Sequence, residues 1–108
     1  MIHVIATVCI APKRRQEFIR EFNANIPNVL AEKGCIQYTP TVDLLSGIDR
    51  QISPEEDTVV IIEQWKTIED LENHLVAPHM LEYRERVKDM VRSAELRITT
   101  SQLNSTNA

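Results

Sequence analysis

Residues 58–80 constrain the fold of this chain more than any other part of the sequence. They open with the β-branched run Thr-Val-Val-Ile-Ile, which is typical of a strand, and the strand pattern extends to Trp65. Thr67 is followed three residues later by Asp70, a spacing that predicts a capping box and the start of a helix. Pro78 predicts a break in that helix, because an interior proline removes a hydrogen bond and clashes with the preceding turn. We therefore expect a strand that leads directly into two short helices.

Each of these two helices carries a histidine. His74 lies toward the apolar stripe of the first helix, where a buried imidazole needs a hydrogen-bond partner or a ligand. It is either a core histidine with a satisfied partner or a catalytic residue. His79 is offset from the apolar stripe of the second helix, which favours a place at the helix start or the rim of a pocket over catalysis. The two histidines are five residues apart, roughly 140° around an ideal helix, so the i, i+4 spacing of a helical metal site is missing.

Three further residues are candidates for a ligand pocket. Arg84 falls within the apolar stripe of Met80, Val87 and Val91, where a charge is costly unless it is paired. It can reach solvent, pair with an acidic side chain, or point into a pocket and hold an anionic oxygen. Tyr83 borders the same stripe and is either a packing residue or a source of a phenol group. Trp65 is a packing residue that can also form a flat wall for an aromatic ligand.

The order of the periodic segments predicts the fold class. The expected strands are residues 2–10, about 35–45, 58–65 and a last one that uses Leu96, Ile98 and Thr100, and the expected helices span about 13–32 and 68–92. This β-α-β-β-α-β order is that of the ferredoxin-like α+β fold, a four-stranded antiparallel sheet with helices on one face, in a single domain over residues 1–100. Pro40 places its strand at a sheet edge or a bulge. Residues 46–57 form a candidate lid or a harmless insertion, and residues 101–108 a polar C-terminal tail.

Two strands are apolar on both faces, which predicts self-association. Residues 2–10 and 59–62 leave few polar side chains for a sheet face that no helix covers. A large exposed apolar patch is unusual on a monomer. We therefore expect a second copy of the chain to cover the bare face and form a homodimer.

Composition argues against several other partners. The chain of 108 residues has a net charge of -4 and a pI near 5.3, so it has no basic stripe for nucleic acid or an anionic membrane. The first ten residues lack the basic region and cleavage site of a signal peptide and are interpreted as a strand. Cys9 and Cys35 are far apart in the sequence and form no metal or redox motif, which favours reduced thiols in a cytoplasmic protein.

The segment around the histidines resembles the antibiotic biosynthesis monooxygenase superfamily. Members of this family show a glutamate, a spacer and a tryptophan at a strand end, then histidine-leucine on a helix, then a proline-histidine-aromatic break. The chain matches with Glu63-Gln64-Trp65, His74-Leu75 and Pro78-His79, and has Met80 at the position of the aromatic residue. The resemblance extends over roughly residues 2–100. It implies a face-to-face dimer of the dimeric α+β barrel type, with one pocket per subunit between sheet and helices.

The resemblance also implies a chemistry. Some family members oxidise small phenols or hydroquinones with dioxygen and without a cofactor or metal, which requires a base, a donor for the developing oxyanion and a dry pocket. In this chain His74 is the expected base or donor, and Arg84 is expected to stabilise an anion. Trp65, His79 and Tyr83 are the expected substrate-binding residues.

Three alternative functions remain open. A haem-degrading branch of the superfamily uses an asparagine, a tryptophan and a histidine ligand where this chain has Thr7, His74 and Arg84, and these differences disfavour haem degradation. A second branch isomerises small phosphorylated signal molecules and shows a similar histidine-proline-histidine pattern. The third alternative is a non-enzymatic dimeric ligand-binding module.

Overall fold

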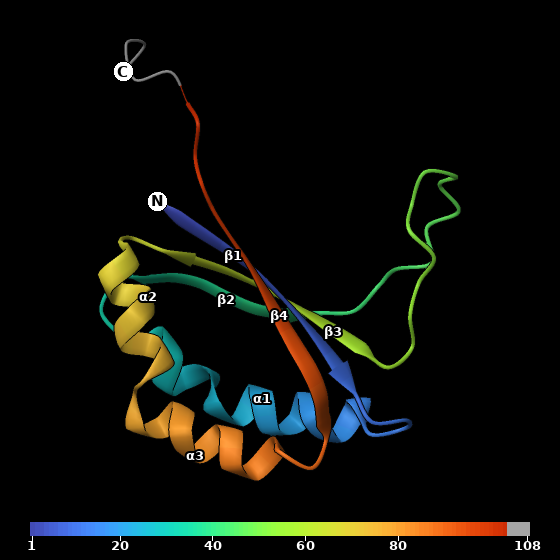
Figure 1. The fold of residues 1–108 in the computed structure, drawn as a ribbon, viewed down its shortest axis with the longest axis horizontal. Helices are drawn as coiled ribbons and strands as arrows, with labels where there is room; N and C mark the ends of the chain where they lie inside the picture. Colours follow the sequence, from blue (N-terminus) through green and yellow to red (C-terminus); the bar gives the residue numbers. More distant parts are fainter. Residues whose placement is uncertain (104–108) are drawn as a thin grey trace.

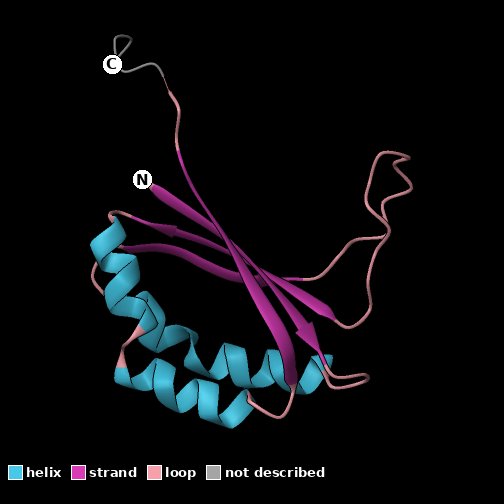
Figure 2. Ribbon diagram, in the orientation of Figure 1, coloured by secondary structure: helices cyan, strands magenta, loops and turns pink. Residues whose placement is uncertain are grey.

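The computed structural model describes residues 1–103, so part of the predicted polar tail, residues 104–108, lies outside the described residues. The elements in chain order are β1 (Ile2–Ile10), α1 (Arg15–Leu30), β2 (Cys35–Thr41), β3 (Thr58–Trp65), α2 (Ile68–Leu75), α3 (Pro78–Val87) and β4 (Val91–Thr100). The strands form one antiparallel sheet in the order β2-β3-β1-β4. The helices lie together on one side of this sheet (Figures 1 and 2). The prediction of a ferredoxin-like α+β fold is confirmed.

Local sequence signals set the helix boundaries. The Thr67 side chain accepts a hydrogen bond from the Asp70 backbone N–H at 3.1 Å and caps α2 as predicted. Pro78 begins α3, a position where its missing N–H costs no helical hydrogen bond. The first helix starts at Arg15 and not at residue 13, because Lys13 has a φ of 67° and cannot belong to a right-handed helix.

The sheet presents alternate residues of each strand to the helices. In β1 these are Val4, Ala6 and Val8, which are buried, and in β3 they are Val59, Ile61, Glu63 and Trp65. Pro40 lies in β2, an edge strand, as predicted. This strand ends at Thr41, before the predicted end at residue 45.

The prediction that helix continues to residue 92 is wrong. The helix α3 ends at Val87 and β4 begins at Val91, which pairs with Ile10 beyond a register shift in β1. Pairing with the full length of β1 satisfies the backbone of β4, which local helical periodicity could not anticipate. Val91 therefore belongs to the sheet and not to the apolar stripe of α3.

The other face of the sheet is not covered by helices. At its centre lie Ile5, which is 40% exposed, and the partly buried Val60 and Ile62. Residues 42–57 leave the sheet as a long projecting loop, which we call the arm (Figure 1). The arm exposes five large aliphatic side chains, those of Val42, Leu44, Leu45, Ile48 and Ile52. It does not line the cavity described below.

Contacts within the arm give it a defined shape. The Gln51 side-chain amide donates to the Leu44 carbonyl oxygen at 2.6 Å, and the Glu55 N–H donates to the Asp43 carboxylate at 3.0 Å.

None of the helices in the described part of the chain is long and apolar enough to cross a membrane.

Gly34 connects α1 to β2 and provides a test of this packing. Its φ is 80°, and a Cβ atom there would lie 2.0 Å from a carboxylate oxygen of Asp70. Gly47 in the arm has a φ of 78° but open space around it. We predict that Gly34→Ala lowers the free energy of unfolding by about 3 kcal/mol, whereas Gly47→Ala costs about 1 kcal/mol, because only the first change adds a steric clash to the backbone strain. Urea unfolding measures both, and equal losses would contradict this packing.

Candidate functional site

A cavity of about 500 Å³ lies between the sheet and the helix layer. Its walls are mainly apolar and come from all four strands and all three helices. The polar residues on its lining are Tyr38, Glu63, His74, Tyr83, Arg84 and Lys88. Apolar walls with a few converging polar groups are typical of a small-molecule site, and the volume is within the usual range for one.

His74 is the most buried of the polar residues on this lining, with 2% of its surface exposed. Its Nδ1 lies 2.7 Å from Oε2 of Glu32, a residue of the connection between α1 and β2. Because Glu32 occupies Nδ1, the other ring nitrogen, Nε2, is the one available to the cavity. A carboxylate that holds one imidazole nitrogen fixes the tautomer and leaves the second nitrogen as a proton acceptor.

Two opposing effects act on the pKa of His74. Burial lowers this pKa below its usual value, and the hydrogen bond to Glu32 partly offsets the decrease. The imidazole also packs against two aromatic rings, with centroid distances of 4.7 Å to Trp65 and 5.3 Å to Tyr38. His74 is therefore a neutral base at neutral pH, held rigidly in an aromatic cage.

His79 lies behind His74 and does not line the cavity. Its Nδ1 lies 3.2 Å from the side-chain amide nitrogen of Asn25, and its Nε2 lies 3.5 Å from the same Glu32 oxygen that contacts His74. That Nε2 is buried and forms no hydrogen bond within the described residues. His79 therefore lies next to the Glu32 carboxylate without a hydrogen bond to it.

Glu63 is a carboxyl group buried on the helix-covered face of β3, with 6% of its surface exposed. Its Oε1 accepts a hydrogen bond from the indole N–H of Trp65 at 2.9 Å. Within residues 1–103 no Lys, Arg or His forms an ion pair with it. Burial raises the pKa of Glu63 to about 7, while the Trp65 hydrogen bond opposes the rise and the charge of Glu32 adds to it. A carboxyl group with this pKa can give or take a proton at neutral pH.

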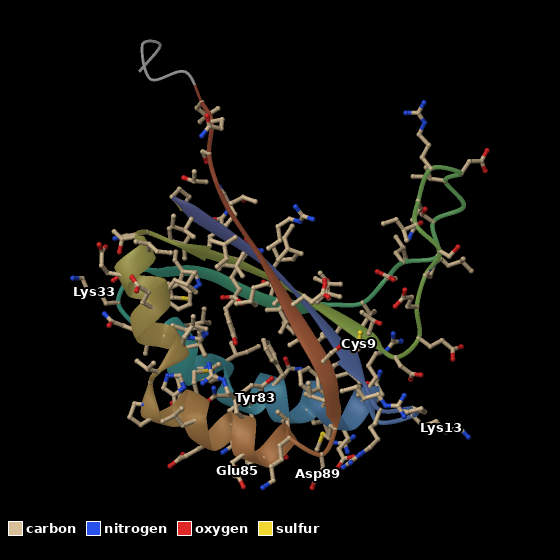
Figure 3. All side chains as sticks on the ribbon, in the orientation of Figure 1. Cys9, Lys13, Lys33, Tyr83, Glu85 and Asp89 are labelled. Atoms are coloured by element: carbon tan, nitrogen blue, oxygen red, sulfur yellow. The ribbon has the colours of Figure 1, made fainter. Side chains whose placement is uncertain are left out.

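Tyrosine and arginine complete the polar lining. Burial is the largest effect on Tyr38 and Tyr83 and raises the pKa of both phenols, so both keep their protons and can donate hydrogen bonds. Tyr83 lies on the inner side of α3, whereas Glu85 points away from the core (Figure 3). Arg84 lines the cavity and is exposed, which agrees with two of the predicted alternatives, a side chain that reaches solvent and one that points into a pocket.

The structure brings together only some of the residues that the sequence singled out. His74, Tyr83 and Arg84 line the cavity, whereas Trp65 and His79 do not. Trp65 is fully buried, contacts His74 and Glu63, and does not form a wall of this cavity. Thr7, which the comparison with haem-degrading proteins placed at the pocket, is also absent from the cavity lining, where its neighbours Ala6 and Val8 are found.

Two important residues were not identified from the sequence as site residues. Glu63 shares its face of β3 with Val59, Ile61 and Trp65, so strand alternation alone could have marked it as a buried carboxyl group. Glu32 gave no such signal, because its contact with His74 joins residues that are far apart in the chain. Within residues 1–103 no group of three or more His, Cys, Asp or Glu side chains is arranged to hold a metal ion.

The fold and the site together define a small ferredoxin-like α+β protein with an acid-base cavity between sheet and helices. A model of the antibiotic biosynthesis monooxygenase family matches residues 1–86. The chain belongs to this family, which confirms the resemblance inferred from the sequence.

Individual relatives agree with this assignment. The chain is 42% identical over 100 residues to a protein of Escherichia coli K12 named "Probable quinol monooxygenase YgiN", covering 91% of this chain and 95% of that protein. The crystal structure of PA3566 from Pseudomonas aeruginosa matches with a TM-score of 0.76 at 24% identity, covering 94% of both chains. A conserved protein from Methanosarcina mazei matches with a TM-score of 0.78 at 24% identity, covering 94% of this chain and 92% of that one. The two structures show the shared fold, and the family and YgiN support a monooxygenase.

The buried Glu63 predicts how stability depends on pH. The carboxyl group loses its proton near pH 4.5 in the unfolded chain and near pH 7 in the folded one. Between these values the folded state binds more protons, so this contribution to stability is present below pH 4.5 and is lost as the pH rises through 7. In the wild type the free energy of unfolding should fall by up to about 3 kcal/mol between pH 4.5 and 8 through this group. We predict that this decrease is absent in Glu63→Gln.

Urea unfolding at several pH values measures this difference. The exposed Glu72 on α2 provides the control, because Glu72→Gln should follow the wild-type pH dependence. Parallel pH curves for wild type and Glu63→Gln would show that the pKa of Glu63 is not raised.

Proposed function

We propose that this protein is a monooxygenase that oxidises a small phenolic or hydroquinone-type substrate with dioxygen and without a cofactor. The observation that carries the proposal is the His74–Glu32 pair at a largely apolar cavity of about 500 Å³. The identity of 42% with a protein named as a quinol monooxygenase favours this substrate class. A planar aromatic ring suits the apolar walls, and its hydroxyl groups suit the few polar groups.

His74 begins the proposed reaction by taking the proton of a substrate hydroxyl group on Nε2. The phenolate gives one electron to dioxygen, and the phenoxyl radical and superoxide combine to form a C–O bond at a ring carbon that bears hydrogen. The ring C–H then loses its proton, its electron pair forms the new C=O bond, and the O–O bond breaks. The departing oxygen leaves as water after taking two protons, equal in number to those lost from the O–H and C–H bonds. One substrate and one dioxygen thus give one quinone-type product and one water.

The remaining polar groups support the anions that form along this path. Arg84 and Lys88 place positive charge on the cavity lining, where it stabilises a phenolate or a peroxide oxygen. Tyr38 and Tyr83 offer phenol hydrogens to a substrate oxygen. The apolar walls exclude water and so strengthen these interactions.

A second candidate function is isomerisation of a small phosphorylated molecule. The presence of two cationic side chains, Arg84 and Lys88, on the lining favours an anionic substrate. His74 would then move a proton between substrate carbons, and dioxygen would play no part. Conversion of substrate under anaerobic conditions separates this function from the monooxygenase, and a ligand bound without turnover indicates a non-enzymatic binding module.

We predict that His74→Phe and Arg84→Met each lower turnover of an active hydroquinone by about 10²-fold or more, the scale for loss of a general base or an oxyanion donor. Oxygen uptake with a panel that includes 1,4-dihydroxynaphthalene, corrected for the uncatalysed rate, provides the measurement. Arg86→Met is the matched control, since Arg86 lies on the same helix, does not line the cavity and pairs with Glu21 at 3.2 Å. Full activity in both cavity variants would exclude His74 and Arg84 from catalysis.

We also propose that two copies of the chain associate through the open face of the sheet. Ile5, Val60 and Ile62 provide the apolar centre of that face, and the exposed aliphatic side chains of the arm add a second apolar surface. The arm projects away from the helices, so it can reach a copy placed against the sheet (Figure 1).

Light scattering should give twice the chain mass of 12.4 kDa at micromolar concentration. We predict that Ile62→Asp gives the monomer mass, because it places a carboxylate without a partner inside the proposed interface. Leu81→Asp is the control, since Leu81 is 55% exposed on α3 and lies on the helix side of the molecule. A wild-type monomer would contradict the proposed dimer.

A further inference from the structure

We infer that Glu63 is a second proton-transfer residue of the cavity, and that the indole N–H of Trp65 is the group that positions its carboxyl. This inference rests on the proposed oxidation of a phenolic substrate. It gives Glu63 a role distinct from that of His74, and it gives Trp65 a role other than that of a ligand wall.

The position of Glu63 is the first argument. The residue lies among apolar side chains of the helix-covered sheet face, opposite Val4 of the neighbouring strand, and yet it lines the cavity. A buried carboxylate without a cationic partner is costly, so Glu63 lowers the stability of the folded protein. An apolar residue would pack at this position without that cost.

The contact with Trp65 is the second argument. Both residues point from β3 toward the helices, and the indole N–H donates to one carboxyl oxygen at 2.9 Å. This bond fixes the carboxyl group and leaves the other oxygen, Oε2, without a side-chain hydrogen bond among the described residues. Since Glu63 lines the cavity, Oε2 is the atom that can exchange a proton with a bound molecule.

The two proton transfers of the proposed reaction give such a group a defined role. The substrate loses an O–H proton and later a C–H proton, and His74 can hold only one proton on Nε2 at a time. A protonated Glu63 can give its proton to the newly formed peroxide oxygen and then, as a carboxylate, take the proton from the ring C–H. His74 returns the first proton to the departing hydroxide, which leaves as water. Both residues then regain their starting states, and no net proton enters or leaves.

The surroundings of Glu63 are consistent with exchange of this kind. The titratable groups around it or on the same cavity are Glu32, Cys35, Tyr38, His74, Tyr83, Arg84 and Lys88. The residues that β1 presents on this side, Val4, Ala6 and Val8, are apolar. Burial outweighs the Trp65 hydrogen bond and raises the pKa of Glu63 to about 7, so both protonation states are accessible near neutral pH.

Kinetics with a labelled substrate provide the first test. We expect Glu63→Gln to lower kcat for 1,4-dihydroxynaphthalene by about 10²-fold with little change in KM, because the amide cannot accept the ring proton. Substrate deuterated at the ring carbons should then show a primary isotope effect on kcat that is larger than in the wild type. Glu72→Gln, which changes an exposed residue of α2, should leave kcat and the isotope effect unchanged.

Trp65→Phe tests the positioning role. It keeps an aromatic ring but removes the N–H group whose hydrogen bond lowers the pKa of Glu63. Since the proposed cycle starts with Glu63 protonated, kcat should fall as the pH rises through this pKa, and Trp65→Phe should shift that fall to higher pH. Carbon-13 NMR of the Glu63 carboxyl should show the same upward shift in the free protein, without any turnover.

The outcomes distinguish this inference from the proposed function. Wild-type kcat and isotope effect in Glu63→Gln would overturn the role of Glu63 and leave the monooxygenase proposal standing. An unshifted Glu63 titration in Trp65→Phe would overturn the positioning role. Failure of the wild-type protein to consume oxygen with any hydroquinone would overturn the proposed function, and the role of Glu63 with it.

Discussion

A polar side chain that is buried on the helix-covered side of the sheet needs a hydrogen-bond partner within the protein. This requirement determines the arrangement of residues at the centre of the structure. His74 meets it through Glu32, and Glu63 meets it through Trp65. Asn25, buried in α1, meets it through His79 and through Asn28, which donates to its side-chain oxygen at 3.0 Å. The first contact joins α2 to the connection between α1 and β2, the second lies within β3, and the contact of Asn25 with His79 joins α1 to α3. The hydrogen bonds to Glu32 and Trp65 hold two polar groups of the cavity, His74 and Glu63, in defined positions.

The two faces of the sheet have different roles. The helix-covered face carries the core and the cavity, whereas the open face combines a small apolar centre with polar edges. Alternation along each strand separates the two sets of side chains, so a change on one face can leave the other intact. This separation allows association and chemistry to be tested independently, with Ile62 as an example on the open face and Glu63 on the covered face.

The fold was predictable from the sequence because its signals are local. The cap at Thr67, the helix start at Pro78 and the edge strand with Pro40 each follow from one residue's backbone or side-chain chemistry. The errors arose where pairing between distant segments overrides local preference, as at Val91, which joins β4 through contact with β1. Family membership agrees with the fold. Structural relatives at 24% identity show only the shared architecture, so the chemistry has to be inferred from the residues of the site.

The sequence by itself determined the order of the elements, the family and three residues of the cavity, His74, Tyr83 and Arg84. It did so because periodicity and short motifs report on neighbours within one helix or strand. Only the tertiary structure decided that Glu32 holds His74, that Trp65 lies behind Glu63 and that Arg84 reaches the cavity from its exposed side. Such relations depend on which elements pack together, and the burial that shifts the pKa of a carboxyl group or an imidazole exists only once they have packed.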